Sequence, residues 1–499
     1  MKSFTERYPI GSRGDLHVMP ILQSPSIPDD VGPRAWAGLA VVAAASFLVS
    51  LDAMVLYIAF REIGREFPSV GTAELSWILS ASSIVVAGGM ISAGRIADRL
   101  GRRRVFLAGT AIFAAASALC AVAPTAGGLI AARALQGLGV AALTPASLAL
   151  ILHAFPRHRV PHAIALWGAA AALAAVLGPT VGGLLVETSG WRAVFALDVV
   201  LGITVVAAGR RLLDESREPA GVRVPDPVGV VAIVLALGLV ALAVTQSGAW
   251  GWTSFRTVGA LLAGFALLGA FVVRCRSVES PVLPLELFAE RAFRWANAGQ
   301  LVFWTGFTLM FFGNVQFLSR VWDYSPAQTG LALAPGPLLV FLLSARFGRL
   351  AARIGQRPIL IAGGVVYAAA AASLLARVDA TPRYLEVWLP SLVLSSVGVA
   401  MLSAQLTSAA LWRLPAERFA TGAAVNGSLR ALGQTLGVAV FAAVVGQGAP
   451  GQLLAGHRTA WWVFAAGLAL TLASLRLPGI APAPRPTLVH DATRQQLAH

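Results

Sequence analysis

Charged residues are scarce in this chain. Asp, Glu, Lys and Arg together make up 12% of its 499 residues, whereas a soluble globular domain carries about 25%. The mean hydropathy is +0.74, and apolar residues come in runs of about 18 to 25, long enough to cross a bilayer core of roughly 30 Å. The composition therefore excludes a soluble protein and predicts an all-α integral membrane protein.

Cysteines and cofactor motifs are also scarce. The two cysteines, Cys120 and Cys275, are expected on opposite sides of the membrane, which argues against a disulfide. The seven histidines show no metal-site spacing. The string G-x-x-x-x-G-K-[ST] does not occur, which excludes ATP as the direct energy source. We therefore expect no enzymatic activity, no metal and no cofactor, with a proton gradient as the energy source.

Basic residues outnumber acidic residues and give a net charge of +15. With a cytoplasmic N-terminus, about 28 Lys and Arg fall in inner loops and about 8 in outer loops, which is a strong positive-inside bias. The charge therefore sets the topology and does not indicate nucleic-acid binding. We expect a protein of the cell (inner) membrane with both termini in the cytoplasm. Residues 1–34 contain no apolar segment typical of a cleavable signal peptide.

The apolar runs predict about fourteen membrane helices, each of roughly twenty residues. The expected ranges are 36–58, 76–97, 105–123, 127–152, 161–185, 193–210, 227–246, 257–274, 294–318, 327–345, 358–376, 387–411, 420–446 and 459–476.

A basic loop is repeated along the chain. Gly94–Arg104 returns in degenerate form as Gly348–Arg357, and each copy follows the second helix of a six-helix block. Parallel repeats of this kind are a known plan of secondary transporters. We therefore predict two six-helix bundles with two helices inserted between them. The expected divisions are an N-terminal tail at 1–34, a first bundle at 35–212, the inserted helices at 213–280, a second bundle at 281–477 and a C-terminal tail at 478–499.

The first copy of the basic loop has the residues of a conformational latch. Its glycines allow a tight turn and a close approach of helices, and Asp98 can pair with arginines or face a helix N-terminus. A plain positive-inside loop would explain the arginines but not Asp98 or the paired glycines. We expect a salt-bridged latch that holds one conformation and is released in the other. The latch comprises Gly94, Asp98, Arg99, Gly101, Arg102 and Arg103.

Two acids and an arginine inside predicted membrane helices are candidates for proton coupling: Asp52, Arg133 and Asp198. Asp52 and Arg133 are each about 9 Å from the outer ends of their helices, so we expect them at similar depth. A carboxylate beside an arginine can change its protonation as hydration changes. We expect Asp52 to couple proton movement, with Asp198 as a competing acid. The alternatives are a structural ion pair, an arginine that extends to the surface, and an interfacial Asp198.

Polar and aromatic residues at helical spacing predict a substrate cavity. They recur on one face of the predicted ninth helix and of the thirteenth, and a glutamine lies on the face of Arg133. Such walls suit amphiphilic, often cationic compounds. Polar contacts between packed helices are the alternative. The residues assigned to the cavity are Gln136, Asn297, Gln300, Trp304, Phe311, Asn426 and Arg430.

Small residues and a proline cluster in the fifth predicted helix. They are Gly178, Pro179, Gly182 and Gly183. Small residues let membrane helices pack closely, and proline bends a helix. Ordinary close packing is one interpretation of this string.

Taken in order, these motifs resemble those of the fourteen-span drug:proton antiporters of the major facilitator superfamily, the EmrB/QacA type. The loop at Gly94 is similar to the superfamily signature G-x-L-a-D-r-x-G-r-k. The string at Gly178 is similar to the antiporter motif g-x-x-x-G-P-x-x-G-G, with Ala174 in place of its first glycine. The resemblance implies efflux driven by the proton-motive force through alternating access.

The resemblance also implies roles for individual residues. Asp52 falls at the family's acidic position in the first helix, and Arg133 is implied to assist proton movement. Members of the family usually have Asn where Asp198 stands, so this additional carboxyl group could change the proton stoichiometry or the charge preference.

We therefore expect a monomeric drug:proton antiporter that exports amphiphilic small molecules, with the lipid bilayer, protons and the substrate as its partners. A second hypothesis is the same fold exporting one endogenous product, such as an antibiotic or a siderophore. A third is a membrane sensor or scaffold that transports nothing. The third hypothesis gives no reason for a buried ionisable pair such as Asp52 and Arg133.

Overall fold

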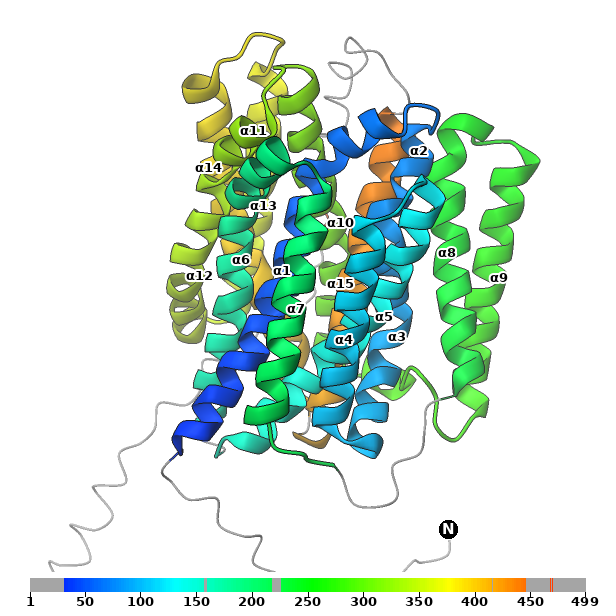
Figure 1. The fold of residues 1–499 in the computed structure, drawn as a ribbon, viewed down its shortest axis with the longest axis vertical. Helices are drawn as coiled ribbons and strands as arrows, with labels where there is room; N and C mark the ends of the chain where they lie inside the picture. The colour runs from blue at the N-terminus through cyan, green and yellow to red at the C-terminus, as the bar shows by residue number, and fades with distance from the viewer. Residues whose placement is uncertain are drawn as a thin grey trace, which may run out of the picture.

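The computed structural model describes residues 31–156, 159–217, 226–414 and 416–445, together with Gly467 and Ala469. Every regular element in these ranges is helical (Figure 1). The long helices are α1 (Pro33–Glu66), α3 (Trp77–Leu100), α4 (Arg102–Ala121), α5 (Ala126–Ala154), α6 (Val160–Ser189), α7 (Arg192–Leu212), α8 (Pro227–Trp250), α9 (Phe255–Ser277), α10 (Arg291–Arg320), α12 (Pro335–Ile354), α13 (Gln356–Arg377), α14 (Leu389–Leu411) and α15 (Ala416–Val445). The short elements are α2 (Thr72–Leu75), η1 (Leu285–Ala289), α11 (Pro326–Leu333) and η2 (Tyr384–Trp388).

Each of the first thirteen predicted membrane helices corresponds to a described helix, and the fourteenth, at 459–476, lies largely outside the described residues. Twelve described segments are long and apolar enough to cross a membrane. Three of these twelve segments contain two helical elements: α2 and α3 are separated by Ser76, α11 and α12 by Ala334, and η2 directly precedes α14. The chain is therefore an all-helical, multi-pass membrane protein.

The helix ends follow local sequence signals. Thr125 and Ser254 accept hydrogen bonds from backbone N–H groups in the first turns of α5 and α9. Gly101 and Gly355 have φ values of 114° and 89°, a region that an L side chain rarely adopts, and each separates two helices. These two glycines end α3 and α12, so the two basic loops make equivalent turns.

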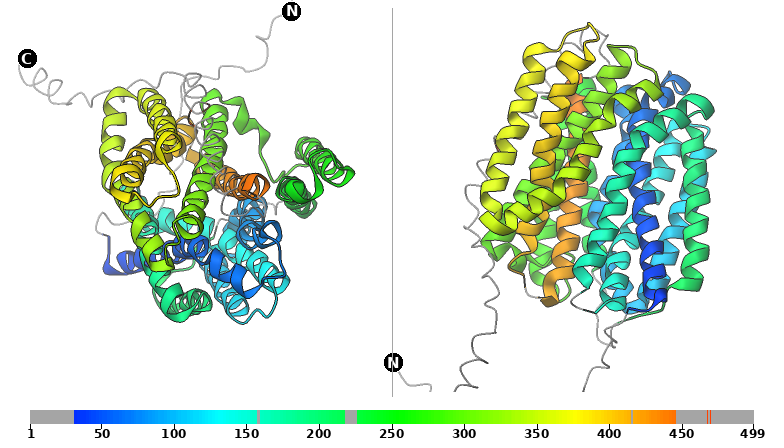
Figure 2. Two further views of the ribbon diagram at one scale, coloured as in Figure 1. Left: turned by 90° about the horizontal axis from the view of Figure 1, so that it is seen from above. Right: turned by 90° about the vertical axis from the view of Figure 1, so that its left-hand side faces the viewer.

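The helices form two groups with a hairpin at one edge (Figures 1 and 2). In the first group α1 packs on α6 and α7, and α5 packs on α3 and α4. In the second group α10, α13 and α15 pack around α14. The hairpin of α8 and α9 contacts α3 and α15, one helix from each group.

Asp226 fixes the base of this hairpin. Its carboxylate accepts hydrogen bonds from Val228 N and Gly229 N in the first turn of α8. It also pairs with Arg274 near the end of α9. The Arg274 guanidinium holds the pKa of the Asp226 carboxyl group below its usual value. One side chain thus caps α8 and joins it to α9.

Polar contacts join the two groups at the end of the molecule opposite the basic loops. Arg61 on α1 pairs with Asp323 at 2.9 Å and donates to the carbonyl oxygen of Ser319. Glu187 on α6 accepts hydrogen bonds from Ser325 Oγ at 2.7 Å and from Ala327 N at 2.9 Å. These bonds close the molecule at that end.

Aromatic rings pack just beneath these polar contacts. Tyr57 of α1 lies 5.6 Å from Phe311 and 5.7 Å from Phe312 of α10, measured between ring centroids. Phe60 lies 5.0 Å from Phe312 in an edge-to-face arrangement. This buried aromatic layer continues the closure toward the middle of the molecule.

The ion pairs found at the basic end stay within one group. Asp98 pairs with Arg102, and Glu215 pairs with Arg104, all in the first group. In the second group Arg413 pairs with Glu290, and Arg418 pairs with Glu286. The ion pair between the two groups that the described residues form therefore lies at the end opposite the basic loops, while α3 and α15 also pack against each other across the groups.

Two glycines allow α6 and α11 to touch across this closed end. A Cβ atom added at Gly330 would overlap the carbonyl oxygen of Pro179, and one added at Gly183 would overlap that of Pro326. Since these obstacles are backbone atoms, no side-chain rotation can relieve the overlap. Any larger residue must separate the two groups at this point.

We predict that Gly330→Ala opens this end of the molecule. Spin labels are attached at Thr188→Cys and Thr381→Cys, both exposed at that end, in a protein that also carries Cys120→Ala and Cys275→Ala. Double electron–electron resonance spectroscopy should show a longer distance between the two labels in Gly330→Ala. Gly269→Ala is the matched control, because nothing lies within 4 Å of an added Cβ atom there. An unchanged distance in Gly330→Ala would show that this contact does not hold the end closed.

Candidate functional site

A buried ion pair lies at the centre of the first group. Arg133 Nη1 on α5 donates to Asp52 Oδ1 at 2.9 Å and to Oδ2 at 2.8 Å on α1. Both residues are 4% exposed. Arg133 Nε donates to the carbonyl oxygen of Ile78 at 3.1 Å, which links the pair to α3. The guanidinium is thus held in the interior and does not extend to the membrane surface.

Gln136 extends this pair into a network. It lies one turn after Arg133 and accepts a hydrogen bond from its guanidinium. Its Nε2 donates to Ser117 Oγ at 2.8 Å on α4 and makes a longer contact of 3.3 Å with Asp52 Oδ1. Gln136 is therefore fully occupied in holding the ion pair and does not line a cavity.

Glycines on α5 bring this network together. A Cβ atom added at Gly137 would lie 2.6 Å from the carbonyl oxygen of Ser82 on α3. One added at Gly139 would lie 2.7 Å from Phe113 N on α4. Because α5 contacts both neighbouring backbones, the side chain of Arg133 reaches α3 and that of Gln136 reaches α4.

Asp198 adds a second carboxyl group to the pair. It lies on α7, is 1% exposed, and is close enough to Asp52 and Arg133 to interact electrostatically with both. Its Oδ2 atom has no hydrogen-bond partner among the described residues. The ring of Phe195, one turn earlier on α7, lies 6.0 Å from the Arg133 guanidinium. Two neighbouring buried carboxyl groups beside a single arginine are an arrangement in which one carboxyl group can carry a proton.

The residues of the predicted latch lie at the junction of α3 and α4. Asp98 pairs with Arg102 at 2.8 Å, and Gly94 packs against Pro145 of α5. Arg103 donates to the carbonyl oxygen of Arg210 at the end of α7. Arg99 is exposed. The loop thus connects α3, α4 and α7 within the first group.

Glu215 is a part of this loop that sequence reasoning missed. Its carboxylate accepts hydrogen bonds from Arg103 N at 3.1 Å and Arg104 N at 3.2 Å, the first turn of α4. It also fills the space beside Gly101, where an added Cβ atom would lie 2.6 Å from Glu215 Oε1. A carboxylate at a helix N-terminus is favourable, but Glu215 is more than one hundred residues away in sequence, and no local pattern indicates the contact.

The small residues of α6 contact helices of both groups. An added Cβ atom at Gly178 would lie 2.8 Å from Met54 Cβ, and one at Gly182 would lie 2.5 Å from Val55, both on α1. Gly183 and Pro179 face α11 of the second group. This string therefore packs α6 against the helix that carries Asp52 and against the partner group at once.

Three of the amides assigned to the substrate cavity bond to one another instead of facing open space. Asn426 Nδ2 donates to Asn297 Oδ1 at 2.9 Å, and Gln300 Nε2 lies 3.3 Å from Asn426 Oδ1. Each is at most 3% exposed. They join α10 to α15, as in the alternative of polar contacts between packed helices. Phe311 is also buried, in the aromatic layer with Tyr57.

Trp304 and Arg430 remain accessible. The Arg430 guanidinium lies 5.5 Å from the centre of the Trp304 ring, in a cation–π arrangement. Arg430 is exposed and Trp304 is half-buried. Of the residues assigned to the cavity, these two are the ones that are not buried.

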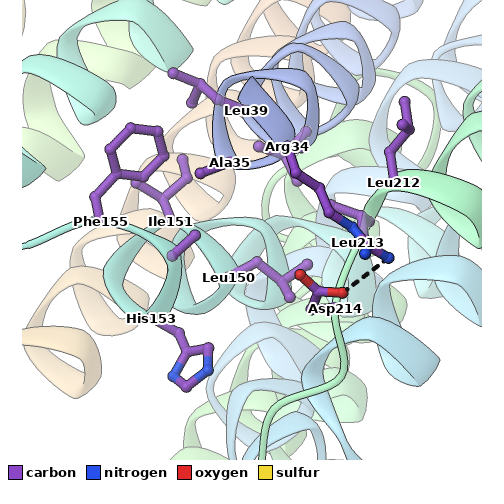
Figure 3. A pocket seen from close by; sticks show the side chains of 13 residues that line it. Arg34, Ala35, Leu39, Leu150, Ile151, His153, Phe155, Leu212, Leu213 and Asp214 are labelled. Carbon is purple, nitrogen blue, oxygen red and sulfur yellow. Dashed lines mark ion pairs between the residues drawn. The ribbon is translucent and has the colours of Figure 1, made fainter. Parts of the chain in front are cut away.

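A separate hollow lies at the basic end of the first group (Figure 3). It has a volume of about 190 Å³ and is lined by α1, α5 and the end of α7, with the Arg34–Asp214 ion pair of 3.1 Å at its edge. Sites for drug-sized ligands usually have about 300–1,000 Å³. None of the predicted site residues lines this hollow, which is too small for such a ligand.

Known proteins resemble the chain over most of its length. Multidrug resistance protein Stp of Mycobacterium tuberculosis is 33% identical over 400 residues, which cover 80% of this chain and 74% of Stp. Puromycin resistance protein pur8 of Streptomyces alboniger is 34% identical over 442 residues, covering 86% and 85%. Multidrug efflux pump LfrA of Mycolicibacterium smegmatis is 31% identical over 415 residues, covering 82% and 81%.

Solved structures share the fold. An auto-inhibited peptide transporter of the POT family superposes with a TM-score of 0.66 at 17% sequence identity, covering 91% of this chain and 99% of the transporter. A sequence profile described as Major Facilitator Superfamily matches residues 42–438. With its two groups of helices, its repeated basic loop and this match over most of its length, the chain belongs to the major facilitator superfamily.

Proposed function

We propose that the chain is an exporter of amphiphilic small molecules, driven by the proton-motive force, in the inner membrane. The observation that carries the proposal is the buried site of Asp52, Arg133 and Asp198. Ionisable groups inside a membrane are costly, and they usually mark ion or proton pathways. The names of the relatives Stp and LfrA, multidrug resistance protein and multidrug efflux pump, support export as the direction.

The charge of the site explains how it couples to protons. With both carboxyl groups ionised, two negative charges face one arginine, and a net negative charge would be buried in the membrane. One proton shared by Asp52 and Asp198 makes the site neutral. Opening of the site toward water on the opposite side of the membrane would hydrate the two carboxyl groups and let the proton leave. Each cycle of alternating access would thus carry one proton through this site.

The direction of the helices supports the proposed topology. The described helices alternate, so α15 ends opposite the basic loops. Residues 459–476 supply another apolar run of membrane length, which would return the C-terminus to the basic end. The positive-inside rule places that end in the cytoplasm. We therefore propose that the protein has fourteen membrane helices in a six-two-six order and that it is a monomer.

A dedicated exporter of one compound is the second candidate. It is favoured by the relative pur8, which is named for resistance to puromycin alone. The two candidates differ in the breadth of substrates and share the proton site. Transport of several unrelated compounds by the purified protein would decide for the multidrug exporter.

The central experiment compares Asp52→Asn with the native protein in inverted vesicles energised by a pH gradient. Addition of a panel of cationic, neutral and anionic antibiotics should release protons with the native protein. In Asp52→Asn the release should fall to the level of vesicles that lack the protein, because the remaining carboxyl group loses its partner for the shared proton. Asp226→Asn is the matched control and should retain transport, since Asp226 lies outside this site. Full activity of Asp52→Asn would remove the proton site from the mechanism.

The latch predicts a different kinetic effect. Asp98→Ala removes the pair with Arg102 at the junction of α3 and α4, so the loop loses a bond that orders one conformation. Turnover should fall by about tenfold, the change that about 1.4 kcal/mol in a barrier produces, while substrate affinity stays within twofold. Asp214→Ala, which breaks the exposed pair with Arg34 at the same end, should change neither quantity. Equal turnover in both variants would exclude the latch.

A further inference from the structure

Arg430 is an accessible arginine in the middle of a membrane helix. It is the fifteenth of the thirty residues of α15, so it lies about 20 Å from either end of the helix. Despite this depth, the side chain is exposed. An arginine at such depth faces a partner or a water-filled space, because contact with lipid is costly.

The neighbours of Arg430 place it at the boundary between the two groups. Its guanidinium lies over Trp304 on α10. Trp304 contacts Phe307 at 5.1 Å, Phe307 stacks on Phe311 at 6.0 Å, and Phe311 meets Tyr57 of α1 in the other group. These three residues of α10 lie on one helical face, and that face is turned toward the first group. Arg430 therefore lies on a helix that packs against α10 of its own group and α3 of the first group; Figure 2 shows α15 in this central place.

No carboxylate is positioned to neutralise Arg430. In the described residues its guanidinium has neither an ion pair nor a hydrogen bond, and the Trp304 ring is its recorded partner. Acidic residues are also rare in the sequence of this half. From residue 291 to residue 476 they occur only near helix ends or in loops, at Asp323, Asp379, Glu386 and Glu417.

The acids of the first group are not available either. Among the twelve candidate membrane spans, Asp52 and Asp198 are the carboxyl groups that lie more than five residues from a helix end. Both interact with Arg133. In the described centre of the molecule, Arg133 thus has a carboxylate partner and Arg430 has none.

A second donor without a partner lies next to Arg430. The indole Nε1 of Trp304 is buried and has no acceptor among the described residues. Buried donors usually have an acceptor, and an arginine guanidinium binds carboxylate, sulfonate or phosphate oxygens strongly. A ligand that pairs with these donors therefore needs a negatively charged acceptor group. The neighbouring aromatic rings suit an apolar part of the same ligand.

We infer that the substrate recognised between the two groups is an aromatic organic anion, whose acidic group binds Arg430 while its ring packs against Trp304 and Phe307. This inference rests on the proposed transport function and specifies its substrate class. It replaces the expectation of cationic compounds. A bound anion would supply the charge that Arg430 lacks, and the aromatic rings would accept compounds of different shape.

The test uses three aromatic probes of nearly equal size: 1-naphthaleneacetate, its neutral amide 1-naphthaleneacetamide, and the cation 1-naphthylmethylammonium. Binding to the purified full-length protein is measured by titration calorimetry. The native protein should bind the acetate about tenfold more tightly than the amide, as expected for a charge-assisted hydrogen bond, and the ammonium compound most weakly. Arg430→Gln should abolish the difference between acetate and amide, and Arg430→Lys should retain part of it.

Two variants serve as controls. Arg346→Gln removes an exposed arginine of the same half, which donates to the carbonyl oxygen of its own helix, and should keep the preference for the anion. Asp52→Asn should also keep it, because binding at Arg430 does not require the proton site. A native protein that binds acetate and amide equally, or a preference that persists in Arg430→Gln, would overturn the inference. Failure of proton release with an intact anion preference would instead contradict the proposed proton coupling alone.

Discussion

The need to neutralise a guanidinium inside the membrane determines the arrangement of the first group of helices. Arg133 donates hydrogen bonds to both carboxylate oxygens of Asp52 and to a carbonyl oxygen of α3, and Gln136 connects the pair to α4. Leaving either charge alone would cost several kcal/mol, so α1, α3, α4 and α5 are held together around the pair. Asp198 on α7 lies beside this pair, and in the proposed mechanism the same site binds one proton.

Backbone contacts at glycines determine how the two groups meet. On α6, Gly178 and Gly182 pack against α1, the helix of Asp52, while Gly183 packs against α11 of the other group. A change of hydration or charge at Asp52 therefore occurs on α1, which contacts α6, and α6 closes the end of the molecule opposite the basic loops. In the proposed mechanism, this contact gives proton binding a physical route to the conformational change, since α6 contacts both α1 and α11.

The sequence predicted the local features and missed those that depend on distant contacts. Apolar length located thirteen helices, and the depth of Asp52 and Arg133 indicated that they could meet. Helical spacing alone could not decide between a cavity and packed helices: Asn297, Gln300 and Asn426 bond to one another, whereas Arg430 is exposed. The cap that Glu215 forms on α4 joins residues far apart in the chain, so no periodic pattern could reveal it.

The central claim is that Asp52 and Asp198 share one proton while Arg133 remains charged. Infrared spectroscopy of the purified protein at neutral pH tests it directly, because a protonated carboxyl group has a C=O absorption separate from that of carboxylates and amides. The account predicts this band in the native protein, its persistence in Arg430→Gln, and its loss or displacement in both Asp52→Asn and Asp198→Asn. A native protein without the band, or a band unaffected by either aspartate substitution, would contradict the account.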